Sequence, residues 1–344
     1  MSTATPPEPR TPTPSQQMIG ILGGFWASRA VCVAAQLGLA DLLAAGPKRV
    51  EELAAATQCH AGSLYRLLRG LASIGCVCEE GPGLFASTPL GDTLRTDVAG
   101  SLRHAIMTTT GGEHYDAWGD LLHAVKTGQV AFDHHFRMPV WKFFEQNPDN
   151  ARVFDQAMTD FTRSIDPALL KAYDFGGFRH VVDIGGGHGA LLAAVLRKHP
   201  HLKGTVFDQP YVAANAVKAL AAENLAQRCD AVGGDFFESV PAGADCYMMK
   251  FIIHDWDEQR AARILLNVRK SIARGGKLLV IDTVIPEGNA PDFSKLMDLN
   301  MLVMTGGRER TQKEFATLLK AGGFQFTRVV PTESMVSVVE AVPA

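Results

Sequence analysis

The stretch from Val181 to Ala190 has the sequence VVDIGGGHGA, and it decides how the second half of the chain is expected to fold. An apolar run is followed by Asp183 and the glycines, and then by the helical spacing of ALLAAVLRKHP. This order is typical of a buried parallel strand that turns tightly into a helix. Glycine at such a turn lets a ligand approach the backbone closely. We therefore expect a ligand to bind here.

Two classes of ligand fit the glycine turn. The spacing of Gly185, Gly187 and Ala190 agrees with the dinucleotide fingerprint G-x-G-x-x-A, and Asp208 follows at about the distance of a ribose-binding acid. Asp183, however, puts a carboxylate where a pyrophosphate needs bare amides and a helix dipole. A ligand with a cationic end suits this carboxylate better.

Short apolar runs alternate with helical patterns in residues 176–344. The runs are HVVDIG, GTVFD, CYMMKFII and KLLVIDTVI, followed by FQFTRVV and MVSVVEA. The alternation predicts a parallel sheet with helices on both faces, and the closing pair, separated only by PTES, predicts a hairpin with one antiparallel strand. In such sheets ligands bind at the carboxyl ends of the strands. The polar residues of interest gather there: Asp183, Asp208, Asp235, Lys250, His254 and Asp282.

The first half of the chain is expected to contain a tail and a helical domain. Residues 1–17 include five prolines and almost nothing apolar, which predicts a disordered tail and excludes a secretory signal. Residues 18–175 form the helical domain, which ends near YDFGGFRH at 173–180. Residues 18–45 are apolar on most faces, so they must be buried against something. A second subunit is the expected partner, which makes the protein a homodimer.

Residues 49–95 have the order of elements of a winged helix. A short helix and a turn precede a longer helix around 65–72, and a hairpin follows with Gly81, Pro82 and Gly83 at its tip. A DNA-binding regulator is therefore an alternative function. The second helix offers only two arginines, and the wing is acidic at Glu79 and Glu80. These charges favour a role in packing and dimerisation.

Composition excludes several classes of protein. The 344 residues are 47% hydrophobic and 20% charged, as in a globular protein long enough for two domains. The formal charge of −3, without a basic stripe, excludes a nucleic-acid partner. No apolar run approaches the roughly 20 residues of a spanning helix, which argues against a membrane. The six cysteines lack metal-binding spacing, so we expect no metal, no disulfide framework and a reducing, cytoplasmic location.

Four segments taken together resemble the S-adenosylmethionine (SAM)-dependent O-methyltransferases of small molecules. They are VVDIGGGHG, FDQP, GGDFFESVPAGADCYMMKFIIHDWDEQR and GGRERTQKEF. The group is that of the plant caffeic-acid-type enzymes and their bacterial antibiotic-pathway relatives, and the resemblance covers nearly the whole chain after the tail. It implies an α/β fold: a Rossmann-like seven-stranded methyltransferase domain after an N-terminal helical and winged-helix dimerisation domain. It also implies SAM as cofactor and a small hydroxy-aromatic substrate.

The resemblance implies a role for individual residues at the strand ends. Gly185 lines the methionyl part of the cofactor, Asp208 binds the ribose hydroxyls, and Asp235 and Phe236 hold the adenine. The full cofactor set comprises Asp183, Gly185, Gly187, Asp208, Asp235, Phe236 and Lys250.

The same resemblance implies a catalytic group. His254 of HDW matches the family's general base, and Glu309 of GGRERT and Asp282 of VIDTVIP match carboxylates that orient it. Many plant members have Glu at the position of Asp282. A phenol with a pKa of about 10 is protonated near neutrality, so a neutral imidazole would take its proton without a metal. A non-methylating use of SAM (decarboxylation-linked, hydroxylating or pericyclic) is an alternative, against which the complete catalytic group counts.

The acceptor is expected between the sheet and the N-terminal helices. Methionine and aromatic side chains suit a flat apolar substrate, although each is equally compatible with ordinary core packing. The candidates are Met158, Phe161, Trp256, Met297, Asn300, Met301 and Met304.

Overall fold

The computed structural model describes residues 12–344, and the contacts within the chain divide it into two compact units after Gly111. The expected boundary near 173–180 marks only the passage from the last helix before the sheet to the first strand of the sheet. The helices between 112 and 172 belong with the sheet because their core includes Val303 and Met304 from a much later helix. Most of the expected tail lies outside the described residues.

The first unit begins with a helix that starts earlier than the sequence suggested. Residues 14–17, expected in the tail, form the first turn of α1 because Thr13 and Gln16 make a capping box and Pro14 occupies the first helical position. The elements of this unit are α1 (Pro14–Gln36), α2 (Leu39–Leu43), β1 (Lys48–Arg49), α3 (Val50–Thr57), α4 (Ala61–Ser73), β2 (Val77–Gly81), β3 (Leu84–Ser87), α5 (Pro89–Asp92) and α6 (Arg103–Thr109).

The expected winged helix is present in this unit. Helices α3 and α4 precede the antiparallel hairpin of β2 and β3, and the short strand β1 adds to β3. Leu53, Leu68 and Phe85 are fully buried between these elements. The wing therefore packs against its own helices around a continuous apolar core.

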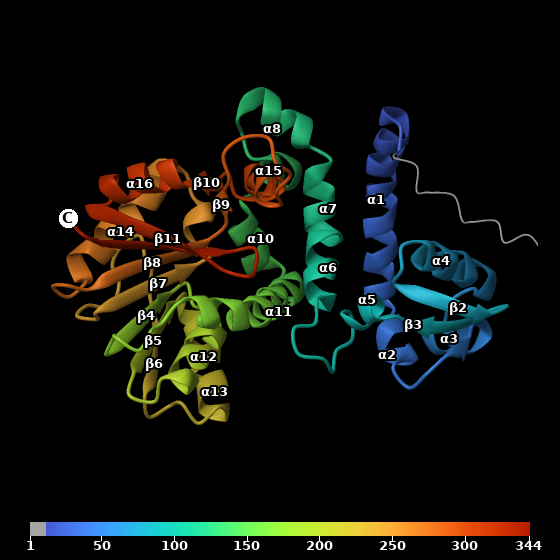
Figure 1. Cartoon of the computed structure of the whole chain (residues 1–344), viewed down its shortest axis with the longest axis horizontal. Helices are drawn as coiled ribbons and strands as arrows, with labels where there is room; N and C mark the ends of the chain where they lie inside the picture. Colours follow the sequence, from blue (N-terminus) through green and yellow to red (C-terminus); the bar gives the residue numbers. More distant parts are fainter. Residues whose placement is uncertain (1–11) are drawn as a thin grey trace, which may run out of the picture. The chain divides into compact units, whose positions relative to one another are not determined.

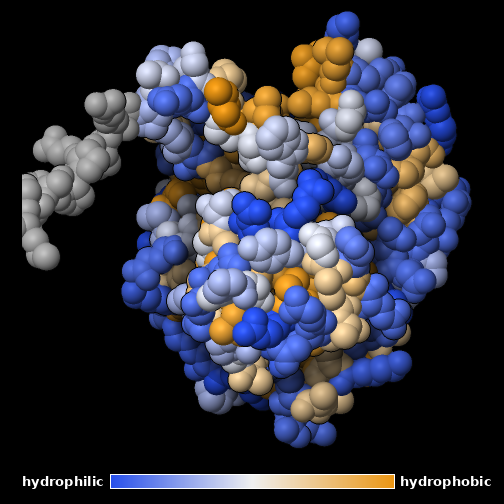
Figure 2. Space-filling view, turned by 90° about the vertical axis from the view of Figure 1, so that its right-hand side faces the viewer, coloured by the Kyte–Doolittle hydropathy of each residue, from blue (hydrophilic) through white to orange (hydrophobic). Residues whose placement is uncertain are grey.

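Helix α1 exposes a large apolar surface. Met18, Ile19, Ile21, Leu22 and Trp26 are between 56% and 72% exposed, and Figure 2 shows hydrophobic side chains gathered at the surface of the molecule. By length and composition α1 is apolar enough to cross a membrane, and it is the one such helix among the described residues. The sequence had led us to expect no segment long and apolar enough to span a membrane, and this expectation is corrected. Alanines and glycines join the short apolar runs into one long helix.

The second unit, residues 112–344, contains the sheet and its helices. The helices are α7 (Gly112–Trp118), α8 (Leu121–Thr127), α9 (Ala131–Phe136), α10 (Val140–Gln146), α11 (Pro148–Ala172), α12 (Ala190–Lys198), α13 (Pro210–Ala222), α14 (Glu258–Ser271), α15 (Ser294–Met304) and α16 (Gln312–Ala321), with the 3₁₀ turn η1 (Ile253–Asp255). The strands are β4 (His180–Ile184), β5 (Lys203–Asp208), β6 (Cys229–Gly233), β7 (Cys246–Lys250), β8 (Lys277–Asp282), β9 (Val284–Ile285), β10 (Arg310–Thr311), β11 (Phe324–Pro331) and β12 (Ser337–Pro343).

Within these residues seven strands form one sheet in the order β11-β12-β8-β7-β4-β5-β6. The strand β12 is antiparallel to both its neighbours, and the pairs from β8 to β6 are parallel. The chain runs from β4 outward to β6 and returns to add β7 on the other side of β4. The expected fold is confirmed, and the strand order changes direction at β4, where such sheets bind ligands.

Helices cover both faces of the sheet. Leu192 of α12 and Leu220 of α13 lie in the core on one face, together with Leu169 of α11. Ile264 of α14 and Phe315 of α16 lie in the core on the other face, and Figure 1 shows these two pairs of helices on opposite sides of the strands. The carboxyl ends of the strands remain available for a site.

Candidate active site

The glycine turn after β4 has the tight geometry that its sequence predicts. Gly185 has a φ of 65°, and a Cβ there would lie 2.2 Å from Cδ1 of Ile252, so glycine is favoured at this position. Gly187, with a φ of 56°, has nothing within 4 Å of the position of a Cβ. The turn therefore presents bare backbone beside open space.

Asp208 at the end of β5 is tied to this turn. Its Oδ2 accepts a hydrogen bond from the Gly187 amide at 2.8 Å, and its Oδ1 accepts one from Gln209 at 2.7 Å. Burial raises the pKa of Asp208, and these two amides oppose that rise. Each oxygen keeps a lone pair for a further donor, such as a ribose hydroxyl.

Asp183 and Lys250 belong to one buried group of charges. Burial raises the pKa of Asp183 to about 7 against the effect of Lys250, and burial lowers the pKa of Lys250 to about 8 against the effects of Asp166 and Asp183. The ammonium of Lys250 donates to the hydroxyl of Thr162. Oδ1 of Asp166 is buried without a hydrogen-bond partner among the described residues. The group thus brings two carboxylates to the end of β4, where a cationic ligand would find them.

Sequence reasoning missed Thr162 and Asp166, which both lie on α11. The signal in the sequence was weak, because polar residues on an amphipathic helix are usually exposed. These two are buried, and the packing of α11 against the sheet places them beside Lys250. Their part in the site depends on that packing.

Asp235 and Phe236 follow β6 but have different surroundings. Asp235 is exposed, and its Oδ1 accepts a hydrogen bond from the Phe237 amide at 2.8 Å, which stabilises the turn. The ring of Phe236 packs edge-on against Phe237 at 4.9 Å and against Trp256 at 5.9 Å. The local turn explains the carboxylate of Asp235, and its contact with adenine stays a prediction.

His254 lies on η1, directly after β7, with the predicted carboxylates around it. Its Nδ1 is 2.8 Å from Oε1 of Glu309 and 4.0 Å from Oδ1 of Asp282. Asp282 therefore contributes charge rather than a hydrogen bond, and its Oδ1 accepts from the Phe251 amide at 3.0 Å. Sequence reasoning missed Asp255, whose Oδ1 is 3.8 Å from Nε2 of His254.

The charges around His254 decide its protonation. Burial by itself lowers the pKa of His254, but Asp282, Glu309 and Asp255 outweigh burial and raise that pKa to about 10. Burial raises the pKa of Asp282 to about 7 and that of Asp255 to about 6, and His254 opposes both rises. The imidazole is thus a stronger base than a free histidine, and it keeps its proton to higher pH.

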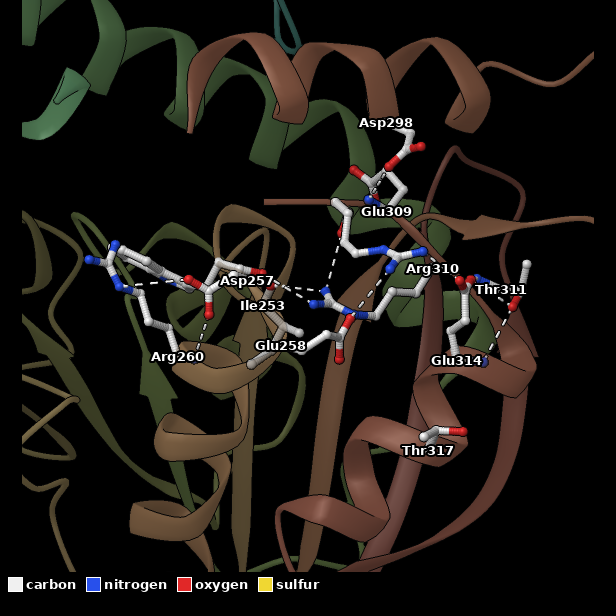
Figure 3. Close-up of polar contacts among 12 residues, drawn as sticks. Ile253, Asp257, Glu258, Arg260, Asp298, Glu309, Arg310, Thr311, Glu314 and Thr317 are labelled. Atoms are coloured by element: carbon white, nitrogen blue, oxygen red, sulfur yellow. Dashed lines mark hydrogen bonds and ion pairs between the residues drawn. The ribbon is translucent and has the colours of Figure 1, made fainter. Parts of the chain in front are cut away.

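Glu309 is held in place from several directions. Its Oε2 accepts from the Thr283 hydroxyl at 2.6 Å, and its amide donates to Oδ1 of Asp298 on α15 at 2.9 Å. Figure 3 shows Glu309 below α15, beside Arg310 and Asp298. With Nδ1 of His254 engaged by this anchored carboxylate, Nε2 is the nitrogen left for an external proton.

The predicted acceptor residues lie on three segments of the second unit. Asn300 accepts from Nε1 of Trp118 at 3.0 Å, whereas Met304 belongs to an apolar core with Phe132 and Phe144. Nε1 of Trp256 is buried without a partner among the described residues. The others lie on α11 and α15: Met158, Phe161, Met297 and Met301. Contact of these residues with an acceptor stays a prediction.

No group of three or more His, Cys, Asp or Glu residues in the described part of the chain could hold a metal ion. The six cysteines, all within that part, are free.

The sheet order, the glycine turn after β4 and the carboxylate after β5 define a class I methyltransferase fold. Residues 118–325 match the model of the O-methyltransferase domain, and residues 19–97 match the O-methyltransferase dimerisation domain. The chain therefore belongs to the O-methyltransferase family. The second match gives the apolar surface of α1 its explanation as part of a dimerisation domain.

Named relatives agree with this membership. The chain is 46% identical over 330 residues to phenazine O-methyltransferase PhzM of Lysobacter antibioticus, with 96% of each chain covered. It is 39% identical over 312 residues to the mitomycin biosynthesis 6-O-methyltransferase of Streptomyces lavendulae, covering 90% of this chain and 89% of the relative. The crystal structure of LaPhzM matches with a TM-score of 0.93 at 45% identity, over 97% of this chain and 100% of that chain.

Other solved structures of this fold contain SAM or S-adenosylhomocysteine. The chain is thus a SAM-dependent O-methyltransferase, and its own residues fit the cofactor. SAM carries an ammonium and a sulfonium, which the buried carboxylates of Asp183 and Asp166 would attract. The bare backbone at Gly187 and the carboxylate of Asp208 fit a ribose.

Proposed function

We propose that the chain methylates a phenolic or enolic hydroxyl of a small aromatic secondary metabolite, with His254 as general base. The observation that carries this proposal is the hydrogen bond from His254 to the anchored carboxylate of Glu309, which leaves Nε2 for the proton of the acceptor. The substrate class is supported by the names of two relatives, a phenazine O-methyltransferase and a 6-O-methyltransferase of mitomycin biosynthesis.

The cofactor supplies an electrophilic methyl group when it is bound. Asp208 would hold the ribose, Asp235 and Phe236 the adenine, and the turn at Gly185 the methionyl part. Asp183, Gly187 and Lys250 complete that site. Holding both reactants in line accelerates a displacement of this kind, because a reaction between two molecules becomes a step within one complex.

In the form of the enzyme in which His254 is neutral, the proton of the acceptor would pass to its Nε2 as the methyl group is transferred. Asp282 and Glu309 would stabilise the imidazolium that forms, because both carboxylates lie near Nδ1. A positioned base of this kind contributes about 10²–10⁴-fold to the rate.

A panel of phenols incubated with methyl-labelled SAM tests the reaction. We expect label on one hydroxyl oxygen of at least one phenol, located by mass spectrometry and NMR of the product. Consumption of SAM without a methylated product, or label on nitrogen alone, would contradict the proposal.

We expect turnover to survive chelation, because His254 is the proposed base and no group of three or more His, Cys, Asp or Glu within residues 12–344 could hold a metal ion. Methyl transfer is measured before and after dialysis against EDTA, with the same dialysis without EDTA as control. Activity that EDTA abolishes and magnesium restores would overturn the proposed chemistry.

We expect two chains to associate through the exposed side of α1, where Ile21 and Trp26 are 72% and 66% exposed. Interfaces of permanent dimers bury roughly 2,000 Å² or more. The double variant Ile21→Glu, Trp26→Glu should therefore sediment as a monomer at micromolar concentration. Leu266→Glu, at an exposed apolar position on α14, is the control and should remain dimeric. A wild-type monomer would rule out this interface.

The location that we propose is the cytoplasm, since free cysteines are typical of reducing compartments.

A further inference from the structure

Arg310 is a fully buried arginine beside the catalytic group. Its Nη1 donates to the carbonyl of Ile253 at 3.1 Å and to that of Arg308 at 3.2 Å, and its Nη2 donates to the carbonyl of Trp256 at 3.1 Å. Its Nε donates to Oε1 of Glu258 at 3.1 Å. Figure 3 shows this guanidinium at the centre of the contacts that join the strand β10 to the start of α14.

Two of these carbonyls belong to the turn that bears His254. Ile253 precedes His254 and Trp256 ends the turn, so one guanidinium joins both ends of η1. The turn has weak bonds of its own, such as the 3.3 Å bond from the Trp256 amide to the Ile253 carbonyl. The planar fork of arginine suits two carbonyls in one plane. A three-residue turn is thereby held by a neighbouring strand.

The residues before Arg310 hold the same turn from the same side. The amide of Arg308 donates to the carbonyl of His254 at 2.8 Å. A Cβ on Gly307 would lie 1.9 Å from that carbonyl oxygen, so only glycine permits the approach. Glu309 binds the imidazole ring. The backbone and the ring of His254 are therefore both held by residues 307–310.

A buried guanidinium is costly unless it is paired and hydrogen-bonded. An apolar side chain could fill the same volume without that cost, but it could not make the four hydrogen bonds of Arg310. Burial raises the pKa of Asp282, and the positive charge of Arg310 is among the effects that lower it. The charge thus acts on the same carboxylate that acts on His254.

We propose that Arg310 is a positioning residue for methyl transfer: it clamps the ends of η1 and so orients Nε2 of His254 toward the acceptor. This inference rests on the proposed role of His254 as general base. It predicts that loss of the clamp lowers the rate of the chemical step while the affinity for SAM is kept.

The test compares Arg310→Met and Arg310→Lys with Arg228→Met. Arg228 also donates to two backbone carbonyls, those of Leu202 and Leu196, so it is the matched control away from His254. We expect Arg310→Met to lower kcat per SAM-binding site by about 10–100-fold, the scale of a misplaced reacting group. SAM affinity from calorimetry should stay within about twofold. Arg228→Met should lower only the melting temperature.

The pH profile separates the clamp from a purely structural role. Removing a positive charge favours protonation of the neighbouring groups. In Arg310→Met, the midpoint of the increase of kcat with pH should therefore move to higher pH. Arg310→Lys keeps the charge and loses the fork, so it should lower kcat and keep the wild-type midpoint. If Arg310→Met is too unstable to assay, Arg310→Lys alone tests the clamp. A kcat per SAM-binding site that is unchanged in Arg310→Lys would overturn the proposal.

A double-mutant cycle with His254→Ala gives the decisive comparison. If Arg310 acts through His254, Arg310→Met should change the rate of the His254→Ala enzyme by less than about threefold. An equal loss in both backgrounds would overturn the role of Arg310 and leave that of His254 intact. A His254→Ala enzyme with the wild-type rate would instead refute the proposed base, and the inference with it.

Discussion

Replacing His254 by alanine is expected to lower the rate of methyl transfer to a phenol by about 10²–10⁴-fold and to leave SAM affinity nearly unchanged. The rate falls because the phenol, with a pKa of about 10, loses the base that takes its proton. The affinity is unchanged because the proposed cofactor set does not include His254, whose ring faces Glu309. Single-turnover kinetics and calorimetry measure the two quantities.

Acceptor acidity provides the control for this variant. The loss of rate in His254→Ala, relative to the wild type, should be smaller with a nitro-substituted phenol, which is ionised near neutrality and needs no base. An undiminished rate with an ordinary phenol at neutral pH would contradict the role of His254, and another base or proximity alone would then carry the reaction.

The wild-type pH profile follows from the same charges. The carboxylates raise the pKa of His254, so the imidazole loses its proton at higher pH than a free histidine. The rate should therefore rise with pH, with a midpoint above the ordinary histidine value of about 6.5. In His254→Ala, the rate should still increase with pH, with a midpoint near the pKa of the acceptor hydroxyl.

Replacing Asp208 by alanine is expected to weaken SAM binding by about 2–3 kcal/mol, the scale of hydrogen bonds to a charged group. The variant loses the proposed acceptor of the ribose hydroxyls, and it loses the acceptor of the Gly187 amide, which joins the glycine turn to β5. Calorimetry measures the affinity. Asp230→Ala, an exposed carboxylate on β6, is the control and should bind SAM as the wild type does. Unchanged affinity in Asp208→Ala would contradict the cofactor assignment.

The succession of the main strands along the chain, the glycine turn and the winged helix were readable from the sequence. Buried parallel strands appear as apolar runs, and glycine is favoured at Gly185 by its left-handed backbone and by the closeness of Ile252. Strand β6 was not predicted because its sequence has no continuous apolar run. It lies at the edge of the sheet, where several of its side chains are exposed. The capping box at Thr13 was likewise a readable signal for an earlier start of α1.

Local patterns along the chain determined which residues stand at the strand ends, among them Asp183, Asp208 and His254. Only the tertiary structure decided what surrounds them. Asp166 reaches the cofactor end of β4 because α11 packs on the sheet, and Arg310 reaches η1 because β10 pairs with β9. The unit boundary at Gly111 also depends on packing, since early helices share a core with α15. The periodicity of apolar residues indicates which face of a helix or strand is buried. Which segment packs against that face depends on the tertiary contacts between segments that are distant in the sequence.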